Sequence, residues 1–271
     1  MICHRRTFVF AAAVCLAAAG LVLCSDEPKL TEEQMKEFLL TAKVVGSKQL
    51  GQGKTHPWRL TLTDGTLTHD AAFQPVDERK PFVKFGSGRT EMNFVDSYHY
   101  NIAAYELAKL IGLGDMVPVA VERKWNGQRG ALAWWIPKKW DEEQRRKANA
   151  PPPDLIAWNN QMYKVRVFSQ LVYDTDRNLG NLLITEDWKL WMIDFTRAFR
   201  LYDKLETPGD LQRCDRQLLE KLRQLDGKEL YEKARPHLTK SEVKAVLTRR
   251  DKIVALFQQL VAEKGEGAVL Y

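Results

Sequence analysis

Apolar and polar residues alternate with a period of two in short runs through the first half of the chain. Trp58–Thr63 alternates as a half-buried strand does, Asp64–Gly65 is a hairpin turn signal, and residues 68–73 form the expected partner strand. The same pattern predicts a second hairpin within residues 117–136, with its tight turn at Asn126–Gly127. The first half is therefore predicted to be rich in β-structure.

Two helices are predicted among these strands. Thr31 followed by Gln34 forms a capping box, so a short helix is expected to follow, up to about Leu40. A second helix is expected over residues 96–111, because Gly112 is a typical helix stop. The charged, glycine-containing stretch before it, residues 76–93, is predicted to be a loop.

Helical spacing dominates the second half. A helix is predicted over residues 155–172, followed by two short strand-like runs at 182–184 and 190–193 and then by helices to the end of the chain. Cys214 falls within one of the leucine repeats at helical spacing and is predicted to be a small core residue of that helix.

A charged stretch that ends in three prolines separates the two halves. It runs from Lys138 to Ala150, and Pro151–Pro153 follow. We therefore expect a β-rich small lobe over residues 26–136, a junction over 137–153 and a helical large lobe over 154–271.

The first 24 residues have the pattern of a signal peptide or N-terminal anchor. Arg5 and Arg6 are followed by an uncharged apolar run over residues 8–23, which is shorter than most membrane spans. Cys24 is placed as the lipidated cysteine of a lipoprotein would be, although Leu23 is larger than the usual preceding residue. We expect an extracytoplasmic protein, either secreted, periplasmic or membrane-anchored, with membrane contact only through this segment.

Composition narrows the function classes. Of 271 residues, 45% are hydrophobic and 28% are charged, and the formal net charge is +6, which suits a globular protein with an acidic ligand such as a phosphate. No basic run is interleaved with aromatics, so nucleic-acid binding is not expected. No histidine stands at metal-ligand spacing from another histidine or a cysteine, so the sequence predicts no zinc site.

The residues that suggest chemistry lie between Tyr173 and Phe199. Asp176 is followed five positions later by Asn181, and two short strands then lead to Asp194. An aspartate that accepts the proton of a hydroxyl, together with amide and carboxylate oxygens for Mg²⁺ or Mn²⁺, is the set that phosphoryl transfer needs. The alternative is structural, with both aspartates capping turns and the asparagine forming an Asx turn.

These motifs resemble the atypical branch of the protein kinase-like fold. Asp176–Asn181 (DRNLGN) and Ile193-Asp194-Phe195 are similar to the catalytic loop and metal motif of secretory-pathway kinases related to the Golgi casein kinase, of type II phosphatidylinositol 4-kinases and of HipA-type kinases. Tyr100–Leu107 and the later Val117-Pro118 look like the regulatory helix of those families and the residues after it. The resemblance spans about residues 45–198 and implies a two-lobed, atypical kinase-like α+β fold.

Two positions depart from the pattern of those families. Their strand lysine, which grips the nucleotide phosphates, lies in a Phe-Lys-Pro context where this chain has Gln74, and their helix glutamate falls where this chain has Asn101. Because both members of the ion pair are amides here, we predict that Gln74 and Asn101 face each other. Lys84 and Glu106 are the alternative pair.

A glycine-containing stretch precedes the strand at Trp58. Gly51 and Gly53 stand where a phosphate-covering loop would be expected, although a plain hairpin turn accounts for them equally well. Trp134 and Trp135 stand where a hinge between lobes would line an adenine site, with core packing as the alternative.

The resemblance implies an ATP-dependent phosphotransferase that uses Mg²⁺ or Mn²⁺ and acts on a hydroxyl acceptor, which could be a protein, a lipid or a small molecule. The residues that it assigns are Asp176 as the base, Asn181 and Asp194 as metal ligands, and Gln74, Lys84, Asn101, Gly51 and Gly53 at the nucleotide. The amide pair favours an alternative, a secreted or anchored pseudokinase that binds without phosphoryl transfer. Nucleotidyl transfer on the same scaffold is a third hypothesis.

Overall fold

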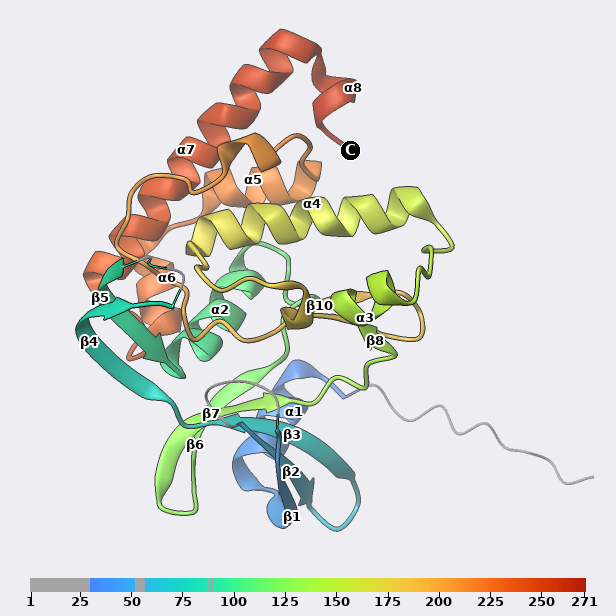
Figure 1. The fold of residues 1–271 in the computed structure, drawn as a ribbon, viewed down its shortest axis with the longest axis vertical. Helices are drawn as coiled ribbons and strands as arrows, with labels where there is room; N and C mark the ends of the chain where they lie inside the picture. The colour runs from blue at the N-terminus through green and yellow to red at the C-terminus, as the bar shows by residue number, and fades with distance from the viewer. Residues whose placement is uncertain (1–29, 52–56, 87, 89) are drawn as a thin grey trace, which may run out of the picture. The chain divides into compact units, whose positions relative to one another are not determined.

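Five antiparallel strands form the largest sheet, in the order β1-β2-β3-β7-β6 (Figure 1). The strands are β1 (Lys43–Gln49), β2 (Trp58–Thr63), β3 (Thr68–Gln74), β6 (Ala120–Trp125) and β7 (Gln128–Trp134). The computed structural model describes residues 30–51, 57–86, 88 and 90–271, and those from Thr31 onward pack as one unit. Both predicted hairpins are confirmed, since β2 pairs with β3 and β6 pairs with β7 in antiparallel register.

Two helices, α1 (Glu32–Thr41) and α2 (His99–Leu110), contact this sheet at β6 and β7. The predicted capping box is present, because the Thr31 hydroxyl accepts from the Gln34 N–H and the Gln34 side chain accepts from the Thr31 N–H. Leu39 of α1, Leu107 of α2 and Leu60 of β2 are all fully buried, and they form part of the core. This packing fixes the orientation of α2, which carries Asn101.

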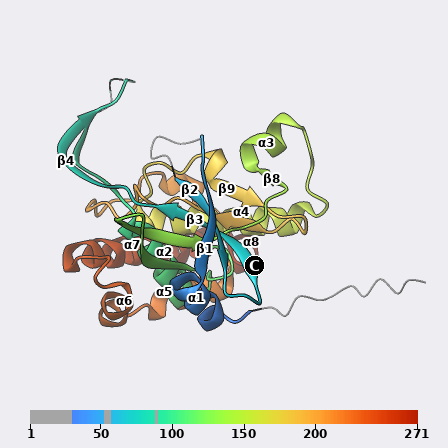
Figure 2. The same ribbon diagram turned by 90° about the horizontal axis from the view of Figure 1, so that it is seen from below.

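Residues 76–93 are not the loop that we expected. They contribute β4 (Asp77–Lys84) and the start of β5 (Thr90–Ser97), which pair only with each other. Figure 2 shows this ribbon extending away from the five-stranded sheet. Most side chains of β4 are exposed, so the strand carries no alternation of buried and exposed positions by which its sequence could be recognised. Because β5 occupies residues up to Ser97, α2 begins at His99 and not at residue 96.

The predicted junction contains regular structure. Residues 138–150 include β8 (Trp140–Asp141) and α3 (Glu142–Lys147), and β8 joins β9 (Leu182–Ile184) and β10 (Leu190–Met192) in a second sheet. Glu142 is buried and receives hydrogen bonds from Arg145 and Arg146, so the charged stretch folds upon itself. The division into lobes at residues 137–153 stays a prediction.

The second half is helical, as predicted. Its helical elements are α4 (Leu155–Val172), η1 (Leu179–Asn181), η2 (Pro208–Asp210), α5 (Arg216–Gln224), α6 (Gly227–Ala234), α7 (Lys240–Lys264) and α8 (Glu266–Val269). The long α7 packs against α4, α5, α6 and α8. Cys214 is buried as expected, but it precedes α5 and forms a β-bridge with Leu270, so its predicted place in a helix is wrong. Across the described ranges, every helix is too short or too polar to serve as a membrane span.

Candidate functional site

The loop that follows α4 begins with a change of backbone direction. Tyr173 ends the helix in the left-handed conformation, with φ of 49°, and the chain turns into Asp174–Asn181. Asp174 is buried, and its Oδ1 accepts the backbone N–H of Asp176 at 3.1 Å. The Asp176 side chain, by contrast, is 52% exposed. The loop therefore presents one carboxylate to solvent and keeps the other inside.

Arg177 holds this loop against the segment that carries Asp194. Its Nη1 donates to the carbonyl oxygens of Asn181 at 3.0 Å and Ile193 at 2.6 Å, and its Nη2 lies 2.5 Å from Asp174 Oδ2. The guanidinium also lies over the Phe195 ring, 4.4 Å from its centroid. The sequence analysis included Arg177 in the motif but gave it no role. It missed Asp174, although an acidic residue three positions before an arginine is a signal for such a pair.

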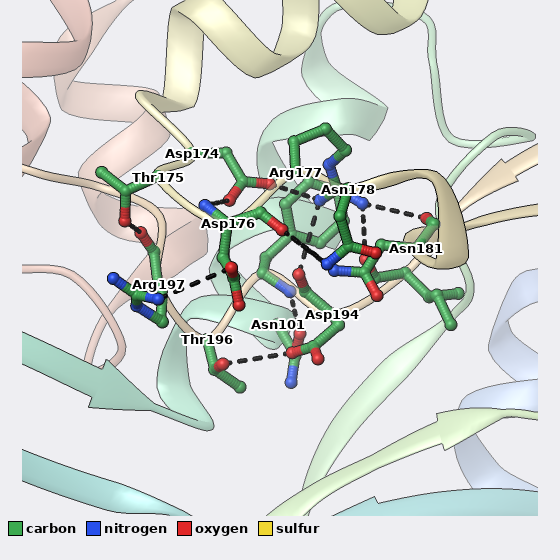
Figure 3. A network of polar contacts seen from close by, with 12 residues as sticks. Asn101, Asp174, Thr175, Asp176, Arg177, Asn178, Asn181, Asp194, Thr196 and Arg197 are labelled. Atoms are coloured by element: carbon green, nitrogen blue, oxygen red, sulfur yellow. Dashed lines mark hydrogen bonds and ion pairs between the residues drawn. The ribbon is translucent and has the colours of Figure 1, made fainter. Parts of the chain in front are cut away.

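The β9–β10 hairpin returns the chain to the same place. Asn181 precedes β9 and Asp194 follows β10, and the N–H of Ile193 donates to the carbonyl oxygen of Asn181 at 3.1 Å. The Asn181 side chain donates from Nδ2 to the carbonyl oxygen of Asp176 at 3.2 Å, which leaves its amide oxygen as the group suited to a cation. Figure 3 shows Asp176, Asn181 and Asp194 within one polar network.

Asp194 is held in an uncommon backbone conformation. Its φ is 58°, in the left-handed region, which few residues other than glycine adopt. Its Oδ1 accepts from the Thr196 hydroxyl at 3.1 Å and from Gln74 Nε2 at 3.3 Å. Aspartate tolerates this region better than most residues, and the two hydrogen bonds fix the direction of its side chain.

Gln74 and Asn101 meet, as we predicted. Asn101 Nδ2 donates to Gln74 Oε1 at 2.6 Å, and Gln74 Nε2 donates onward to Asp194. On its other side, Asn101 Oδ1 accepts the backbone N–H of Phe195 at 2.7 Å. The Phe195 N–H thus fixes the orientation of the Asn101 amide, which in turn fixes that of Gln74. Two neutral amides connect β3 and α2 to the Asp194 segment.

We expect Gln74→Lys and Asn101→Glu each to destabilise the protein when introduced alone. The lysine would lose the hydrogen bond from Asn101 Nδ2, although its ammonium would lie near the Asp194 carboxylate, and the new glutamate would add a second carboxylate to the network of Asp194. The double variant should recover part of the loss, with a coupling free energy of roughly 1–3 kcal/mol, because the two charges then pair. Urea unfolding of the four proteins measures this coupling. Additive effects would show that the new side chains do not meet.

A buried carboxylate on the β4–β5 ribbon holds two arginines beside this network. Glu91 is 4% exposed, and it pairs with Arg197 at 2.9 Å and with Arg200 at 2.7 Å. Arg197 Nη1 in turn lies 3.5 Å from Asp176 Oδ1. The sequence held no signal for Glu91 as a site residue, because residues 76–93 were predicted to be a loop. The ribbon therefore positions a cation next to the candidate base.

The oxygen atoms around Asp194 suit a divalent cation. Asp96, at the end of β5, has one carboxylate oxygen, Oδ1, that is buried without a hydrogen-bond partner. Burial raises the pKa of Asp96, against a hydrogen bond from Thr196, and the negative charge of Asp194 raises it further. A cation shared by Asp194, Asn181 and Asp96 would find only hard oxygen ligands, which Mg²⁺ and Mn²⁺ prefer.

Other predicted site residues lie elsewhere. Lys84 is exposed at the end of the β4–β5 ribbon, opposite Thr90, and the structure does not bring it to Asp194. Glu106 pairs instead with Lys36 at 2.9 Å and Lys109 at 3.7 Å, so the alternative Lys84–Glu106 pair is wrong. The physical reason is that Lys84 belongs to a separate two-stranded sheet.

The glycine stretch is only partly described. Gly51 is exposed just after β1, and Gly53 lies outside the described residues. Trp134 stacks on His69, with ring centroids 3.9 Å apart, and contacts Phe38 edge-on, which favours the core-packing alternative. Trp135 lies beneath the Arg59 guanidinium, 4.6 Å from the ring centroid.

Comparison with known proteins identifies the fold. Neither protein-family models nor curated protein sequences gave a match to this chain. Among solved structures, the Fam20 protein of hydra, determined with a sugar, is 14% identical, with a TM-score of 0.66 over 88% of this chain and 91% of that one. The Golgi casein kinase with Mn and ADP bound is 12% identical, with a TM-score of 0.61 over 88% of this chain and 78% of that one. The proinflammatory kinase CtkA of Helicobacter pylori is 12% identical, with a TM-score of 0.53 over 83% of this chain and 98% of that one.

Two of these structural neighbours are kinases by name, and at such identities the likeness concerns the fold. The chain has an atypical kinase-like α+β fold, with a β-rich sheet region and a helical part. The resemblance drawn from DRNLGN and Ile193-Asp194-Phe195 is thereby confirmed at the level of the fold.

Proposed function

We propose that this protein is an ATP- and divalent-metal-dependent phosphotransferase acting on a hydroxyl group. The observation that carries the proposal is the network joining Asp176, Asn181 and Asp194 through Arg177 and the β9–β10 hairpin. This network holds a carboxylate at the surface beside two oxygen ligands for a metal. The arrangement matches the needs of phosphoryl transfer, in which positioning and charge stabilisation supply most of the catalysis.

Asp176 is the proposed base. Its exposed carboxylate can accept a hydrogen bond from an incoming hydroxyl and then its proton, while the backbone of the loop stays fixed by Asp174. Arg197, 3.5 Å away, orients this carboxylate, and it offers a positive charge to a phosphate that approaches the same place.

Asn181 and Asp194 are the proposed metal ligands, with Asp96 near Asp194. A bound Mg²⁺ or Mn²⁺ would neutralise the phosphates of the nucleotide. Gln74 and Thr196 orient Asp194 by donating to its Oδ1, so the second oxygen is the one available for the cation. The Golgi casein kinase structure, which has Mn and ADP bound, supports the choice of a nucleotide and a divalent metal as cofactors.

The amide pair favours a second candidate, a pseudokinase that binds nucleotide without turnover. In place of a lysine on the phosphates, Gln74 gives one N–H to Asp194 and its oxygen to Asn101. No positive charge is supplied from this strand position, so a triphosphate is bound less tightly. The Gln74→Lys, Asn101→Glu double variant should therefore bind ATP more tightly than the natural protein.

The comparisons and the N-terminal sequence also bear on the acceptor and on the cellular location. The hydra Fam20 structure contains a sugar, and the Golgi casein kinase belongs by its name to the secretory pathway. We propose an acceptor with a free hydroxyl, in a protein, a lipid or a small molecule, and an extracytoplasmic location consistent with the apolar run at residues 8–23.

Asp176→Asn tests the proposed activity. In the presence of Mn²⁺, the full-length chain should hydrolyse ATP to ADP and phosphate, with water as the acceptor. The variant should do so roughly 10²–10⁴-fold more slowly while its ADP affinity is unchanged. Because the Asp176 side chain is exposed, the variant should melt at the same temperature as the natural protein. A natural protein that binds ADP but forms none from ATP would be the pseudokinase. Equal rates for the natural protein and the variant would remove Asp176 from the mechanism.

A further inference from the structure

A second cluster of ligand-type side chains lies outside the network of Asp194. His99 stands at the first residue of α2, Glu122 on β6, and His237 between α6 and α7. His99 Nδ1 and His237 Nδ1 are 2.8 Å apart, and Glu122 Oε2 is 4.0 Å from His99 Nδ1. One ligand atom from each of the three residues lies within 4.8 Å of the others. The fold thus brings together two imidazoles that are 138 residues apart in sequence.

These distances suit a shared metal ion. Ligand atoms around a tetrahedral zinc ion, at bonds of about 2.0–2.1 Å, are about 3.4 Å apart. The present separations lie on both sides of that value, so small side-chain rotations would bring the three atoms to it. Two imidazole nitrogens and one carboxylate oxygen form a ligand set that favours Zn²⁺, whereas Mg²⁺ favours oxygen ligands alone.

The surroundings of the cluster resemble the outer shell of a metal site. The other ring nitrogen of His99, Nε2, faces Asp77 Oδ2 at 3.9 Å, and Ser97 donates to Oδ1 of the same carboxylate at 2.7 Å. A carboxylate behind the distal nitrogen orients a metal-bound histidine. Glu122 is oriented in turn by Arg129, at 2.6 Å from Oε1, and by the Tyr98 hydroxyl, at 3.0 Å from Oε2.

Burial also favours the neutral form of His237. Burial and the neighbouring His99 together lower the pKa of His237 to about 4. His99, Glu122 and His237 are each half-buried, so an ion from solvent can reach them.

We propose that His99, Glu122 and His237 bind one zinc ion, with water in the fourth position. The ion would tie the start of α2 and strand β6 to the turn between α6 and α7. Its role is to lock α2, and with it Asn101, against the helical part of the chain. This site is separate from the oxygen ligands of Asp194 in both chemistry and residues. The sequence predicted no zinc site, because spacing along the chain cannot show a pair of histidines that only the fold brings together.

The test uses zinc chloride alone with the purified full-length chain, first stripped of metal by a chelator and then dialysed. Mass-spectrometric metal analysis should find about one zinc per chain, and zinc should raise the melting temperature by several degrees. His237→Asn and Glu122→Gln should each lose both effects. His69→Gln, which removes a histidine that contacts Trp134 and Trp135, should keep both.

Asp194→Asn separates this proposal from the proposed function, because it should retain zinc binding. His99→Gln provides a second ligand variant if His237→Asn fails to fold. Zinc binding that survives in the folded ligand variants, or that Asp194→Asn abolishes, would overturn the proposal. So would a natural protein that binds no zinc, in which case His99 and His237 only share a hydrogen bond.

Discussion

Replacing Arg177 with methionine should lower the free energy of unfolding by roughly 3–5 kcal/mol, the largest stability effect that we expect from a single substitution in the site. The Arg177 side chain is 10% exposed and its partner Asp174 is 0% exposed, so the substitution leaves a buried carboxylate without its counter-charge. It also removes the hydrogen bonds to the carbonyl oxygens of Asn181 and Ile193. Urea denaturation at neutral pH measures the loss.

Two further variants test whether the lost counter-charge causes this loss of stability. Arg166→Met, at an exposed arginine of α4, should change stability by less than about 0.5 kcal/mol. Adding Asp174→Asn to Arg177→Met should restore part of the loss, because a neutral amide needs no counter-charge. If Arg177→Met costs no more than Arg166→Met, the loop does not depend on this arginine.

Asp194→Asn should weaken metal-dependent binding of ADP at least about tenfold, with little loss of stability. An amide is a poorer ligand than a carboxylate for Mg²⁺ or Mn²⁺, but its oxygen can still accept from Gln74 and Thr196. Removing the charge also relieves repulsion with Asp96, whose pKa burial and Asp194 together raise. Metal-free Asp194→Asn should therefore melt at or above the temperature of the natural protein.

The matched control is Asp187→Asn, at an exposed aspartate in the turn between β9 and β10. It should leave the affinity for ADP unchanged, because the hydrogen bond that Asp187 accepts from Thr185 lies outside the network of Asp194. An Asp194→Asn protein that unfolds, or that binds ADP with Mn²⁺ as tightly as the natural protein does, would assign Asp194 a structural role only.

Local patterns in the sequence were sufficient for much of the fold. The β2–β3 hairpin and the capping box at Thr31 depend on neighbouring residues, and both are present. The β4–β5 ribbon was missed because most side chains of β4 are exposed and the two strands pair only with each other. Cys214 was misplaced because its leucine neighbours have helical spacing, whereas its backbone pairs with Leu270 far along the chain.

The site residues likewise include some that a local pattern predicts and some that it does not. Asp176, Asn181 and Asp194 lie within one short stretch, so spacing and resemblance could single them out. The pairing of Glu91 with Arg197 spans 106 residues, and Glu91 lies on the ribbon that was predicted to be a loop. Pairings of this kind depend on how separate elements pack, which no local pattern specifies.

Calorimetric titration of the full-length chain with ADP, with and without Mn²⁺, tests the central claim most directly, because it needs neither an acceptor nor turnover. We predict binding that requires Mn²⁺ and that Asp194→Asn weakens at least about tenfold. Absence of binding under both conditions, or an affinity that Mn²⁺ does not change, would contradict a nucleotide and metal site at Asp176, Asn181 and Asp194.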